Sequence, residues 1–347
     1  MKFNLAFIGF GTVGQGLAKI LVDKKDLLKQ KHNFEFNVVA VSDIKKGTVL
    51  NESGLNLRKL LQLIQKTGTI KDYESARKGL SSVEVIEKGN ADVIIEATWT
   101  NLETGEPGLT HMRKALTAGK HVVTTNKGPI ALAYRELIQI AKTNNAFLRF
   151  EGTVLSGTPT LNLTLEDLAG AYVKSVRGIV NGTTNYILTQ MESGVSYQKA
   201  LVTAQKLGYA EADPTMDVEA WDAVAKIAIL ANVVMNGDLK VKDVERTGIT
   251  RVTVKDVKAA LNEGKRIKLI AKAWRKNGEI IAKVSPEKVP LTDVLAHIGG
   301  PLNALTFDTD VLKDVTIVGR GAGGTEAGYA LLSDMLAINR YVSGTQR

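Results

Sequence analysis

The stretch that most constrains the fold is Gly-Phe-Gly-Thr-Val-Gly at 9–14, which directly follows an apolar run at 3–8. The run predicts a first strand, and the apolar residues at helical spacing beyond the glycines predict a helix. A G-x-G-x-x-G motif between a strand and a helix is typical of a dinucleotide-binding unit, in which Gly9 makes the tight turn, Gly11 lets the backbone approach a pyrophosphate, and Gly14 allows close packing. The helix N-terminus then faces the phosphates. The sequence therefore predicts NAD or NADP bound at Gly9, Phe10, Gly11, Thr12, Val13 and Gly14.

The choice between the two cofactors stays open in the sequence. A second predicted strand at 37–41 leads to Asp43, which follows Gly14 by 29 residues, whereas an acid that binds the ribose hydroxyls usually follows after about 20 residues. A polar insert between the two explains the longer spacing. Asp43 favours NAD, but Lys45 and Lys46 follow at once and are suited to the 2′-phosphate of NADP.

The rest of the first half continues an α/β pattern. The expected elements are a buried strand at 91–98, an amphipathic helix at 108–118, a strand at 121–125 and a helix at 130–143. A continuous apolar strand is typical of a parallel sheet. Lys127 then sits on a β–α loop at the carboxyl end of a parallel strand, which is where open α/β sheets bind ligands. A solvated loop lysine is the plain alternative.

After residue 150 the strands become alternating and lysine-rich, at 173–180, 265–274 and 280–284, with helices between them. This pattern predicts an α+β domain with a mixed sheet covered by helices. A further glycine-rich turn at 319–324 precedes a last helix. The expected division is a dinucleotide-binding domain at 1–150, a catalytic and dimerisation domain at 151–315, and a C-terminal segment at 316–347 that returns to the first domain.

Composition excludes several classes of function. The chain has no cysteine, which removes thiol nucleophiles and thiolate metal sites, and its four histidines lack metal-ligand spacing. The net charge is +9, but the lysines are scattered and aromatic residues are only 5%, so no nucleic-acid partner is expected. No apolar run approaches the ~20 residues that span a bilayer. Without a secretory signal, we expect a cytoplasmic protein that does not bind membranes.

An acid–lysine pair stands out on a helix predicted at 218–235. The helix is apolar on nearly every face, which indicates burial. Asp222 and Lys226 are spaced i, i+4 on it, so their side chains lie within reach of each other. Buried charges are costly unless they are paired or used. The pair is therefore either a structural ion pair or a proton-handling site, and the segment by itself does not decide.

The chemistry of a nicotinamide enzyme narrows this choice, because hydride transfer needs an acid or base for the hydroxyl proton. No histidine–acid arrangement is evident, no tyrosine has a lysine four residues on, and thiol chemistry is absent. What remains is a lysine held among carboxylates, and Lys127 and Lys226 are the candidates. Burial lowers the pKa of a lysine and neighbouring carboxylates raise it, so the sign of the shift stays open.

Five motifs in this order resemble homoserine dehydrogenase over nearly the whole chain: GFGTVG at 9–14, GKHVVTTNKGP at 119–129, VNGTTNYIL at 180–188, GYAEADPTMDVEAWDAVAK at 208–226 and GRGAGG at 319–324. The resemblance implies an NAD(P)-dependent interconversion of L-aspartate 4-semialdehyde and L-homoserine in the biosynthesis of aspartate-derived amino acids (threonine, methionine, isoleucine). It also implies a homodimer. Since the chain ends soon after the glycine turn, feedback through a C-terminal regulatory module is not expected.

The resemblance further implies roles for single residues. Lys226 resembles the proton-handling lysine, with Lys127 on the other side of the substrate, and which of them delivers the proton stays open. Asp222 would orient the substrate hydroxyl or a bridging water. Glu211 would bind the substrate ammonium, and Asp217 would belong to the same acidic pocket.

Other positions match family positions that line the ligands. Asn181, Gly182 and Thr183 resemble the substrate loop, Thr98 lies beside the nicotinamide, and Gly321, Ala322 and Gly323 return the chain to the cofactor domain. Glu151, Val154, Ser156 and Thr158 match positions that hold a monovalent cation such as Na⁺, largely through backbone oxygens.

Two positions depart from the family pattern. Ala220 stands where a glycine is expected, and Trp99 follows Thr98 where a proline is usual, which puts the pocket shape beside the nicotinamide in doubt. Two other functions are alternatives for a chain with these motifs. One is a related NAD(P)-dependent amino-acid or imine reductase, in which the acidic cluster binds a different ammonium. The other is a dinucleotide sensor without turnover, which would leave Lys226 unexplained.

Overall fold

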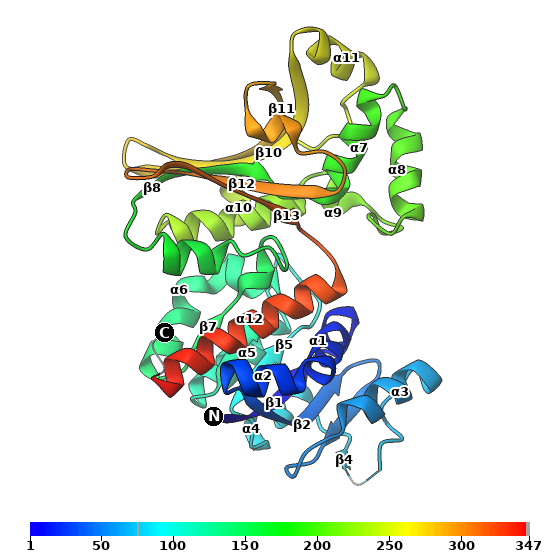
Figure 1. Ribbon diagram of the computed structural model, residues 1–347, viewed down its shortest axis with the longest axis vertical. Coiled ribbons are helices and arrows are strands. Elements are labelled where there is room, and N and C mark those ends of the chain that lie inside the picture. Colours follow the sequence, from blue (N-terminus) through cyan, green and yellow to red (C-terminus); the bar gives the residue numbers. More distant parts are fainter. Residues whose placement is uncertain (75, 345–347) are drawn as a thin grey trace. The chain divides into compact units, whose positions relative to one another are not determined.

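The computed structural model describes residues 1–74 and 76–344, which form two compact units (Figure 1). Unit 1 contains residues 1–157 together with the chain from Gly323 onward, and unit 2 contains Thr158–Ala322. The predicted fold class, a Rossmann domain with an α+β domain, is confirmed. The functional division expected for 1–150, 151–315 and 316–347 stays a prediction.

Unit 1 is built on a seven-stranded sheet with the order β4-β3-β2-β1-β5-β6-β7. Its strands are β1 (Lys2–Ile8), β2 (Glu35–Asp43), β3 (Gly47–Leu50), β4 (Arg77–Lys78), β5 (Val93–Glu96), β6 (His121–Thr124) and β7 (Leu148–Arg149). Strand β1 pairs in parallel with both β2 and β5, and the parallel pairing continues to β7. The chain therefore leaves β1 in one direction and later returns to its other side at β5. Ligands bind at such a switch point, beyond the carboxyl ends of the strands.

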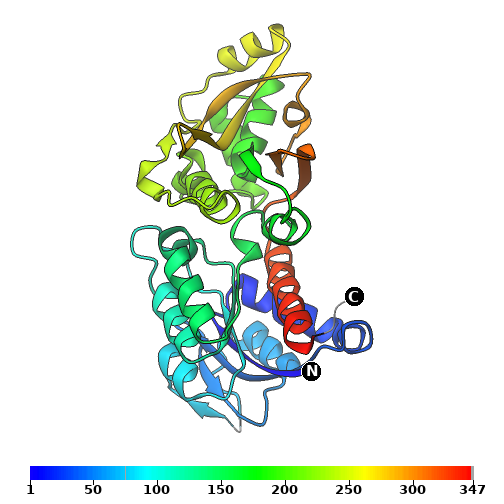
Figure 2. The same cartoon turned by 90° about the vertical axis from the view of Figure 1, so that its left-hand side faces the viewer.

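Helices cover both faces of this sheet, and Figure 2 shows α5 and α6 on one side and α1 and α12 on the other. The helices of unit 1 are α1 (Thr12–Asp23), α2 (Lys25–His32), α3 (Leu57–Thr67), α4 (Ser82–Lys88), α5 (Gly108–Thr117), α6 (Lys127–Thr143), the short η1 (Glu151–Thr153) and α12 (Gly324–Ser343). Among the described residues, no helix is long and apolar enough to cross a membrane.

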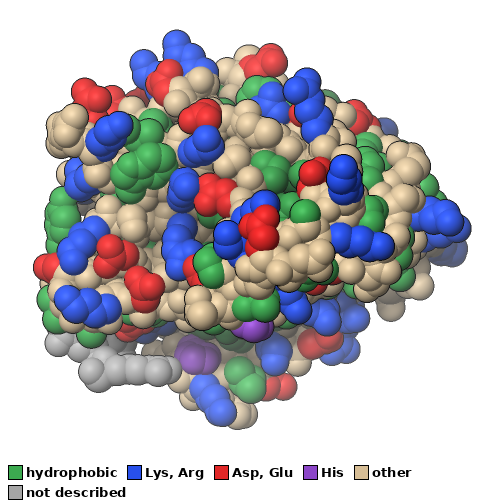
Figure 3. All heavy atoms as spheres, turned by 90° about the horizontal axis from the view of Figure 1, so that it is seen from above, with side chains coloured by type: hydrophobic (Ala, Val, Ile, Leu, Met, Phe, Trp, Pro, Cys, Tyr) green, Lys and Arg blue, Asp and Glu red, His purple; other side chains and the backbone are tan. Residues whose placement is uncertain are grey.

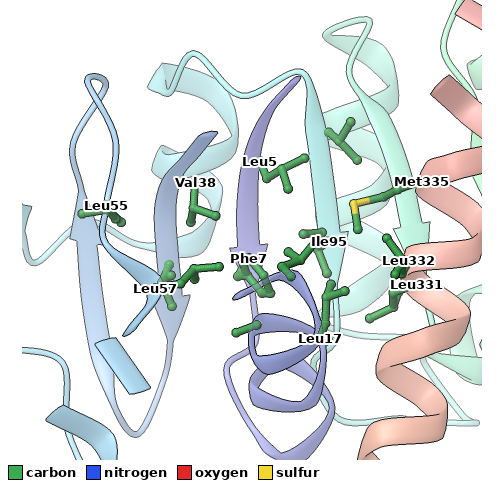
Figure 4. Close-up of a cluster of buried hydrophobic side chains, with 14 of the residues drawn as sticks. Leu5, Phe7, Leu17, Val38, Leu55, Leu57, Ile95, Leu331, Leu332 and Met335 are labelled. Atoms are coloured by element: carbon green, nitrogen blue, oxygen red, sulfur yellow. The ribbon is translucent and has the colours of Figure 1, made fainter. Parts of the chain in front are cut away.

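The core of unit 1 joins the first and last helices of the chain to the sheet (Figure 4). Phe7 of β1 and Leu17 of α1 are fully buried in one cluster with Leu331 of α12. The two helices approach closely, because a Cβ atom on Gly16 would lie 2.3 Å from the carbonyl oxygen of Gly324. Apolar residues from opposite ends of the sequence therefore share one core. This core excludes water from the contact between β1 and α1, the two elements that flank the glycine turn.

Unit 2 has a mixed six-stranded sheet with the order β13-β12-β8-β10-β11-β9. Its elements are η2 (Leu163–Asp167), β8 (Val173–Ile179), α7 (Gly182–Glu192), α8 (Tyr197–Lys206), α9 (Thr215–Val218), α10 (Trp221–Val234), η3 (Val241–Asp243), β9 (Glu245–Arg246), α11 (Val254–Asn262), β10 (Lys265–Lys276), β11 (Glu279–Pro290), η4 (Val294–His297), β12 (Leu302–Thr309) and β13 (Lys313–Arg320). All neighbours are antiparallel except β11 and β9. Helix α10 packs along the sheet, chiefly against β10 and β11.

Two element boundaries differ from those predicted. The apolar stretch at 218–235 is not one helix, because Ala220 has φ +66° and separates α9 from α10. A left-handed residue cannot continue a right-handed helix. Lys127 is the first residue of α6 rather than a loop residue, since Asn126 caps the helix by accepting a hydrogen bond from the Gly128 N–H at 3.2 Å.

Candidate functional site

The central feature of unit 2 is a charged pair inside its most buried helix. Every residue of α10 from Ala223 to Val233 is buried. Lys226 Nζ lies 2.7 Å from Asp222 Oδ2 and donates a hydrogen bond of 2.7 Å to the backbone oxygen of Val180. The Lys226 side chain is 8% exposed and that of Asp222 is 14% exposed. The predicted i, i+4 pair thus exists in a largely desolvated site.

Asn181 connects this pair to a second carboxylate. Its Nδ2 donates to Asp217 Oδ1 at 2.7 Å and to Asp222 Oδ2 at 3.0 Å. Its Oδ1 accepts the Thr184 N–H at 2.9 Å and so caps α7. One amide side chain therefore fixes the beginning of α7 and the spacing of two carboxylates. Four predicted residues, Asn181, Asp217, Asp222 and Lys226, lie in one cluster.

The electrostatics of the cluster single out Asp217. Burial, together with the negative charge of Asp222, raises the pKa of the Asp217 carboxyl, although hydrogen bonds from Asn181 and Thr183 and the charge of Lys226 act in the opposite direction. The ionised form of Asp217 is therefore less favoured than that of an ordinary aspartate.

The remaining substrate-loop residues surround this cluster in different ways. Thr183 Oγ1 donates to the Tyr209 backbone oxygen at 2.6 Å, which ties α7 to the loop after α8. Gly182 packs closely, because a Cβ atom there would lie 2.7 Å from the Pro301 backbone oxygen. Glu211 is exposed, and its backbone oxygen accepts a hydrogen bond of 3.1 Å from Gln205.

In unit 1 the glycine turn has the geometry expected of a phosphate cradle. Gly9 has φ +96°, and a Cβ atom there would lie 2.4 Å from the Ala97 backbone oxygen, so only glycine fits. At Gly11 a Cβ atom would meet nothing within 4 Å. The backbone of this residue is therefore open on one side. This fits a pyrophosphate that approaches the turn at the start of α1.

Asp43 locks the turn through its carboxylate. Oδ2 accepts the Phe10 N–H at 2.8 Å, and Oδ1 accepts the N–H groups of Lys45 and Lys46 at 2.9 Å each. Partial burial acts to raise the pKa of Asp43, but these hydrogen bonds and the nearby Lys46 outweigh it, and the pKa is lowered. Lys46 Nζ is 3.9 Å from Asp43, whereas Lys45 is exposed.

The loops after β5 and β6 are hydrogen-bonded to each other and to a buried acid, Glu96, to which the sequence motifs assign no role. Glu96, at the end of β5, is fully buried, and its carboxylate lies 3.5 Å from Nδ1 of the buried His111. Its side chain also accepts hydrogen bonds from Thr98. Trp99 is 54% exposed. The sequence does not predict this histidine–acid pair, because one member ends a strand and the other lies on a helix. The only signal in the sequence was an acid that ends an apolar strand.

The segment expected to hold a cation follows β7. Glu151 is buried, and its backbone N–H donates to Asp334 Oδ2 at 2.9 Å. Val154 is buried, and Ser156 has φ +53°, while its buried Oγ has no hydrogen-bond partner among the described residues. Thr158 Oγ1 donates to the Arg320 backbone oxygen at 2.9 Å. A buried hydroxyl without a hydrogen-bond partner among the described residues is compatible with an unseen ion or water at this position.

The second glycine turn joins β13 to α12. Gly323 has φ +133°, and a Cβ atom there would lie 2.0 Å from Glu326 Oε2. At Gly321 a Cβ atom would lie 1.9 Å from Asn303 Oδ1. Ala322, between them, is the last residue of unit 2.

Comparison with known proteins gives a consistent result. Residues 9–151 match the family described as "Homoserine dehydrogenase, NAD binding domain", and residues 159–336 match "Homoserine dehydrogenase". The chain is 46% identical over 336 residues to a homoserine dehydrogenase of Methanocaldococcus jannaschii, which covers 96% of this chain and 98% of that protein. It is 40% identical over 346 residues to an NAD(+)-dependent homoserine dehydrogenase of Pseudomonas canavaninivorans, with coverage of 99% and 98%.

Solved structures agree with the sequence relatives. A putative homoserine dehydrogenase from Archaeoglobus fulgidus has a TM-score of 0.87 at 39% identity, covering 97% of this chain and 99% of that one. A hyperthermophilic archaeal homoserine dehydrogenase in complex with NADPH has a TM-score of 0.83 at 28% identity, with coverage of 100% and 99%.

Proposed function

Because the chain belongs to the homoserine dehydrogenase family, it is an NAD(P)-dependent oxidoreductase that interconverts L-aspartate 4-semialdehyde and L-homoserine, and we propose that Lys226 handles the proton of the substrate oxygen. One observation carries this proposal. Lys226 is buried at the centre of α10, with its ammonium held by Asp222 and by the backbone oxygen of Val180. A lysine in such a site is either a costly structural feature or a reactive one.

The geometry supplies a role for each proton of the ammonium. An ammonium has three donors, and the contacts with Asp222 and Val180 use two of them. The third is available to a substrate oxygen. When bound, the nicotinamide accepts or supplies the hydride. In the reducing direction Lys226 gives its proton to the aldehyde oxygen as negative charge develops there, and in the oxidising direction the neutral amine removes the hydroxyl proton. Asp222 stabilises the charged form and holds the lysine in place.

Lys127 is proposed as a second catalytic lysine, because it begins α6 at the carboxyl end of β6 and is set there by the capping residue Asn126. Which of the two lysines delivers the proton is decided by comparing the variants Lys127→Ala and Lys226→Ala. The variant that lacks the proton-donating lysine should show the larger loss of kcat at every pH. The variant that lacks the other lysine should show a smaller loss of kcat together with a changed Michaelis constant.

The substrate ammonium is proposed to bind Asp217 and Glu211, with Asn181, Gly182 and Thr183 lining the same pocket. The raised pKa of Asp217 supports this role, since a bound ammonium would replace the solvation that burial removes. Glu211→Gln and Asp217→Asn should each raise the Michaelis constant for homoserine. An unchanged constant in both variants would contradict ammonium binding at these residues.

The cofactor is proposed to lie on Gly9, Gly11 and Gly14 with Phe10, Thr12 and Val13, near Thr98, and to be completed by Gly321, Ala322 and Gly323. Asp43 favours NAD, because a carboxylate with a lowered pKa repels a 2′-phosphate. Lys45 is the residue suited to the phosphate of NADP. Kinetics of Asp43→Ser and Lys45→Ala with both cofactors distinguish the two. Asp43→Ser should favour NADP, and Lys45→Ala should favour NAD.

A monovalent cation such as Na⁺ is proposed to bind backbone oxygens of Glu151, Val154, Ser156 and Thr158, supported by the buried Ser156 hydroxyl without a partner among the described residues. The cation would hold this segment in place, and no reaction step is assigned to it. Thermal unfolding in sodium against tetramethylammonium salts is the test. A higher unfolding temperature in sodium that disappears in Ser156→Val is the expected result, and equal temperatures would refute the site.

The protein is further proposed to be a cytoplasmic homodimer that binds neither nucleic acid nor membranes. The mixture of basic and acidic side chains on the face seen in Figure 3 supports the absence of a nucleic-acid partner. The homodimer is proposed from the resemblance to the family. Light scattering that gives the mass of one chain would contradict the dimer.

A further inference from the structure

A single buried carboxylate in unit 1 connects two loops that the proposed function uses. Glu96 is fully buried at the carboxyl end of β5. One of its oxygens, Oε1, accepts the Thr98 N–H at 3.2 Å and also the Thr98 hydroxyl. The other, Oε2, lies 3.2 Å from Thr124 Oγ1 at the end of the neighbouring strand β6. Thr98 and Thr124 thus share one acceptor group.

The network continues from Thr124 to the start of α6. Thr124 Oγ1 accepts the Asn126 N–H at 2.9 Å. Asn126 caps α6, and its Nδ2 donates to the Trp99 backbone oxygen at 3.1 Å and to Thr98 Oγ1 at 3.4 Å. Lys127 is the next residue. The Thr98–Trp99 segment and the first turn of α6 are therefore bonded to each other and to the same acid.

The far side of Glu96 is fixed as well. His111 of α5 is buried, with Nδ1 3.5 Å from Glu96 Oε1 and Nε2 2.7 Å from the Ser82 hydroxyl at the start of α4. At Gly108, the first residue of α5, a Cβ atom would lie 2.6 Å from Asn126 Nδ2 and 3.3 Å from Glu96 Oε2. Residues of α4 and α5 therefore pack behind the Glu96 carboxylate.

A buried carboxylate is costly unless its hydrogen bonds are complete. Apolar side chains in place of Glu96 and His111 could fill the same space in the core without burying a charge. The Glu96 carboxylate is explained if it orients its hydrogen-bond donors, Thr98 and Thr124, for the reaction. We propose that Glu96 is a positioning residue, which sets Thr98 beside the nicotinamide and, through Thr124 and Asn126, sets the helical turn that carries Lys127. This inference rests on the roles proposed above for Thr98 and Lys127.

The network also predicts which replacement keeps the function. In Glu96→Gln, Oε1 can still accept both hydrogen bonds from Thr98. The amide NH₂ would face Thr124 Oγ1, which lies 2.9 Å from the Glu96 backbone oxygen and can donate its proton there. Glutamine therefore satisfies the geometry without the charge, whereas Glu96→Ala leaves Thr98 and Thr124 without their shared acceptor.

The test compares steady-state turnover of homoserine, cofactor dissociation constants and unfolding temperatures. Glu96→Ala should lower kcat by about 10²-fold, the effect of a misplacement of about 1 Å, while the cofactor dissociation constant changes by less than about threefold. Glu96→Gln should restore kcat to within about fivefold of the wild type. Asn339→Ala, which removes a partly buried hydrogen bond from Asn339 on α12 to the His32 backbone oxygen at the end of α2, is the control for general loss of stability.

A double variant separates this inference from the proposed role of Lys127. If Glu96 acts through Lys127, then Glu96→Ala should reduce kcat much less in a Lys127→Ala background than in the wild type. Equal reductions in both backgrounds would overturn the connection from Glu96 to Lys127, and a Glu96→Ala variant with wild-type kcat would overturn the inference as a whole. A Lys127→Ala variant with wild-type kcat would instead refute the role of Lys127.

If Glu96→Ala does not fold, Gly108→Ala tests the same network, because its methyl group would lie 2.6 Å from Asn126 Nδ2 and must displace that side chain, while the Glu96 carboxylate is retained. We expect kcat to fall by about tenfold or more, a larger loss of kcat than in Asn339→Ala, together with a lower unfolding temperature because the methyl group overpacks a buried contact. Unchanged kcat in a folded Gly108→Ala variant would overturn the inference. A fall in kcat and in unfolding temperature no larger than those of Asn339→Ala would also overturn it.

Discussion

The two units build their candidate sites from different materials. In unit 2 the site consists of side-chain charges on a buried helix, with Lys226 between Asp222 and the backbone oxygen of Val180. In unit 1 it consists of backbone groups at strand ends, with Gly9 in a conformation that only glycine adopts easily. The difference teaches that the function of the unit 2 site should be sensitive to loss of a charge, whereas that of the unit 1 site should be sensitive to gain of a methyl group.

The largest effect is expected at Lys226. Lys226→Ala should lower kcat by about 10²–10⁴-fold, the range for removing a general acid or base. It also leaves Asp222 buried without its partner, which should lower the free energy of unfolding by about 3–5 kcal/mol. Turnover and denaturant unfolding measure the two effects.

The matched control is Lys272→Ala in the same unit. Lys272 pairs with Glu287 at 2.7 Å, but its side chain is 33% exposed, so the loss should be within about 1 kcal/mol and turnover should persist. Wild-type turnover in Lys226→Ala would remove that lysine from the mechanism.

The next effect distinguishes two glycines of the same turn. Gly9→Ala forces a Cβ atom to 2.4 Å from the Ala97 backbone oxygen at φ +96°, so it should lower both stability and cofactor affinity. In Gly11→Ala the added methyl group would meet no atom of the described residues within 4 Å. This methyl group should instead meet the pyrophosphate and weaken cofactor binding by about 1–3 kcal/mol, or roughly 5–150-fold, with an unchanged unfolding temperature. Cofactor titration and thermal unfolding measure both. Equal cofactor affinity in Gly11→Ala and wild type would place the pyrophosphate elsewhere.

Much of this contrast was predictable from the sequence, because local patterns encode it. The glycine motif predicted β1 and α1, and the i, i+4 spacing predicted the ion pair of Asp222 and Lys226. The sequence did not predict the contact of Glu96 with His111, since hydrogen bonds between a strand end and a helix depend on tertiary packing. Nor did it predict the break at Ala220, because alanine rarely adopts a positive φ.

A smaller effect should follow pH through Asp217. Its raised pKa means that the carboxyl is protonated at low pH and ionised once the pH rises above its folded-state value. Only the ionised form attracts the substrate ammonium, so the Michaelis constant for homoserine should fall as pH rises through that value.

In Asp217→Asn this pH dependence should disappear and the Michaelis constant should stay high. The wild-type folded state also loses stability as pH rises from the ordinary aspartate pKa through the raised one, because folding then buries a charge. Asp217→Asn should therefore be at least as stable as wild type at pH 7. A retained pH dependence of the Michaelis constant in Asp217→Asn would assign it to another group.

The smallest effect is expected at Ala220. Glycine relieves a left-handed alanine by about 1–2 kcal/mol, but it gives up a buried methyl group worth about 0.8 kcal/mol and adds about 0.5–1 kcal/mol of backbone entropy cost. Ala220→Gly should therefore change the free energy of unfolding by less than about 1 kcal/mol and leave kcat unchanged. A large loss of turnover would show that the turn before α10 controls the position of Lys226.

The most direct test of the account is homoserine-dependent reduction of NAD⁺ and of NADP⁺ by the intact chain, followed by absorbance of the reduced nicotinamide. The account predicts turnover with at least one cofactor, and the ratio of the two rates reports whether Asp43 or Lys45 dominates cofactor recognition. Cofactor binding without any homoserine turnover would contradict the account and point to another ammonium-bearing substrate or to a protein that only senses the dinucleotide.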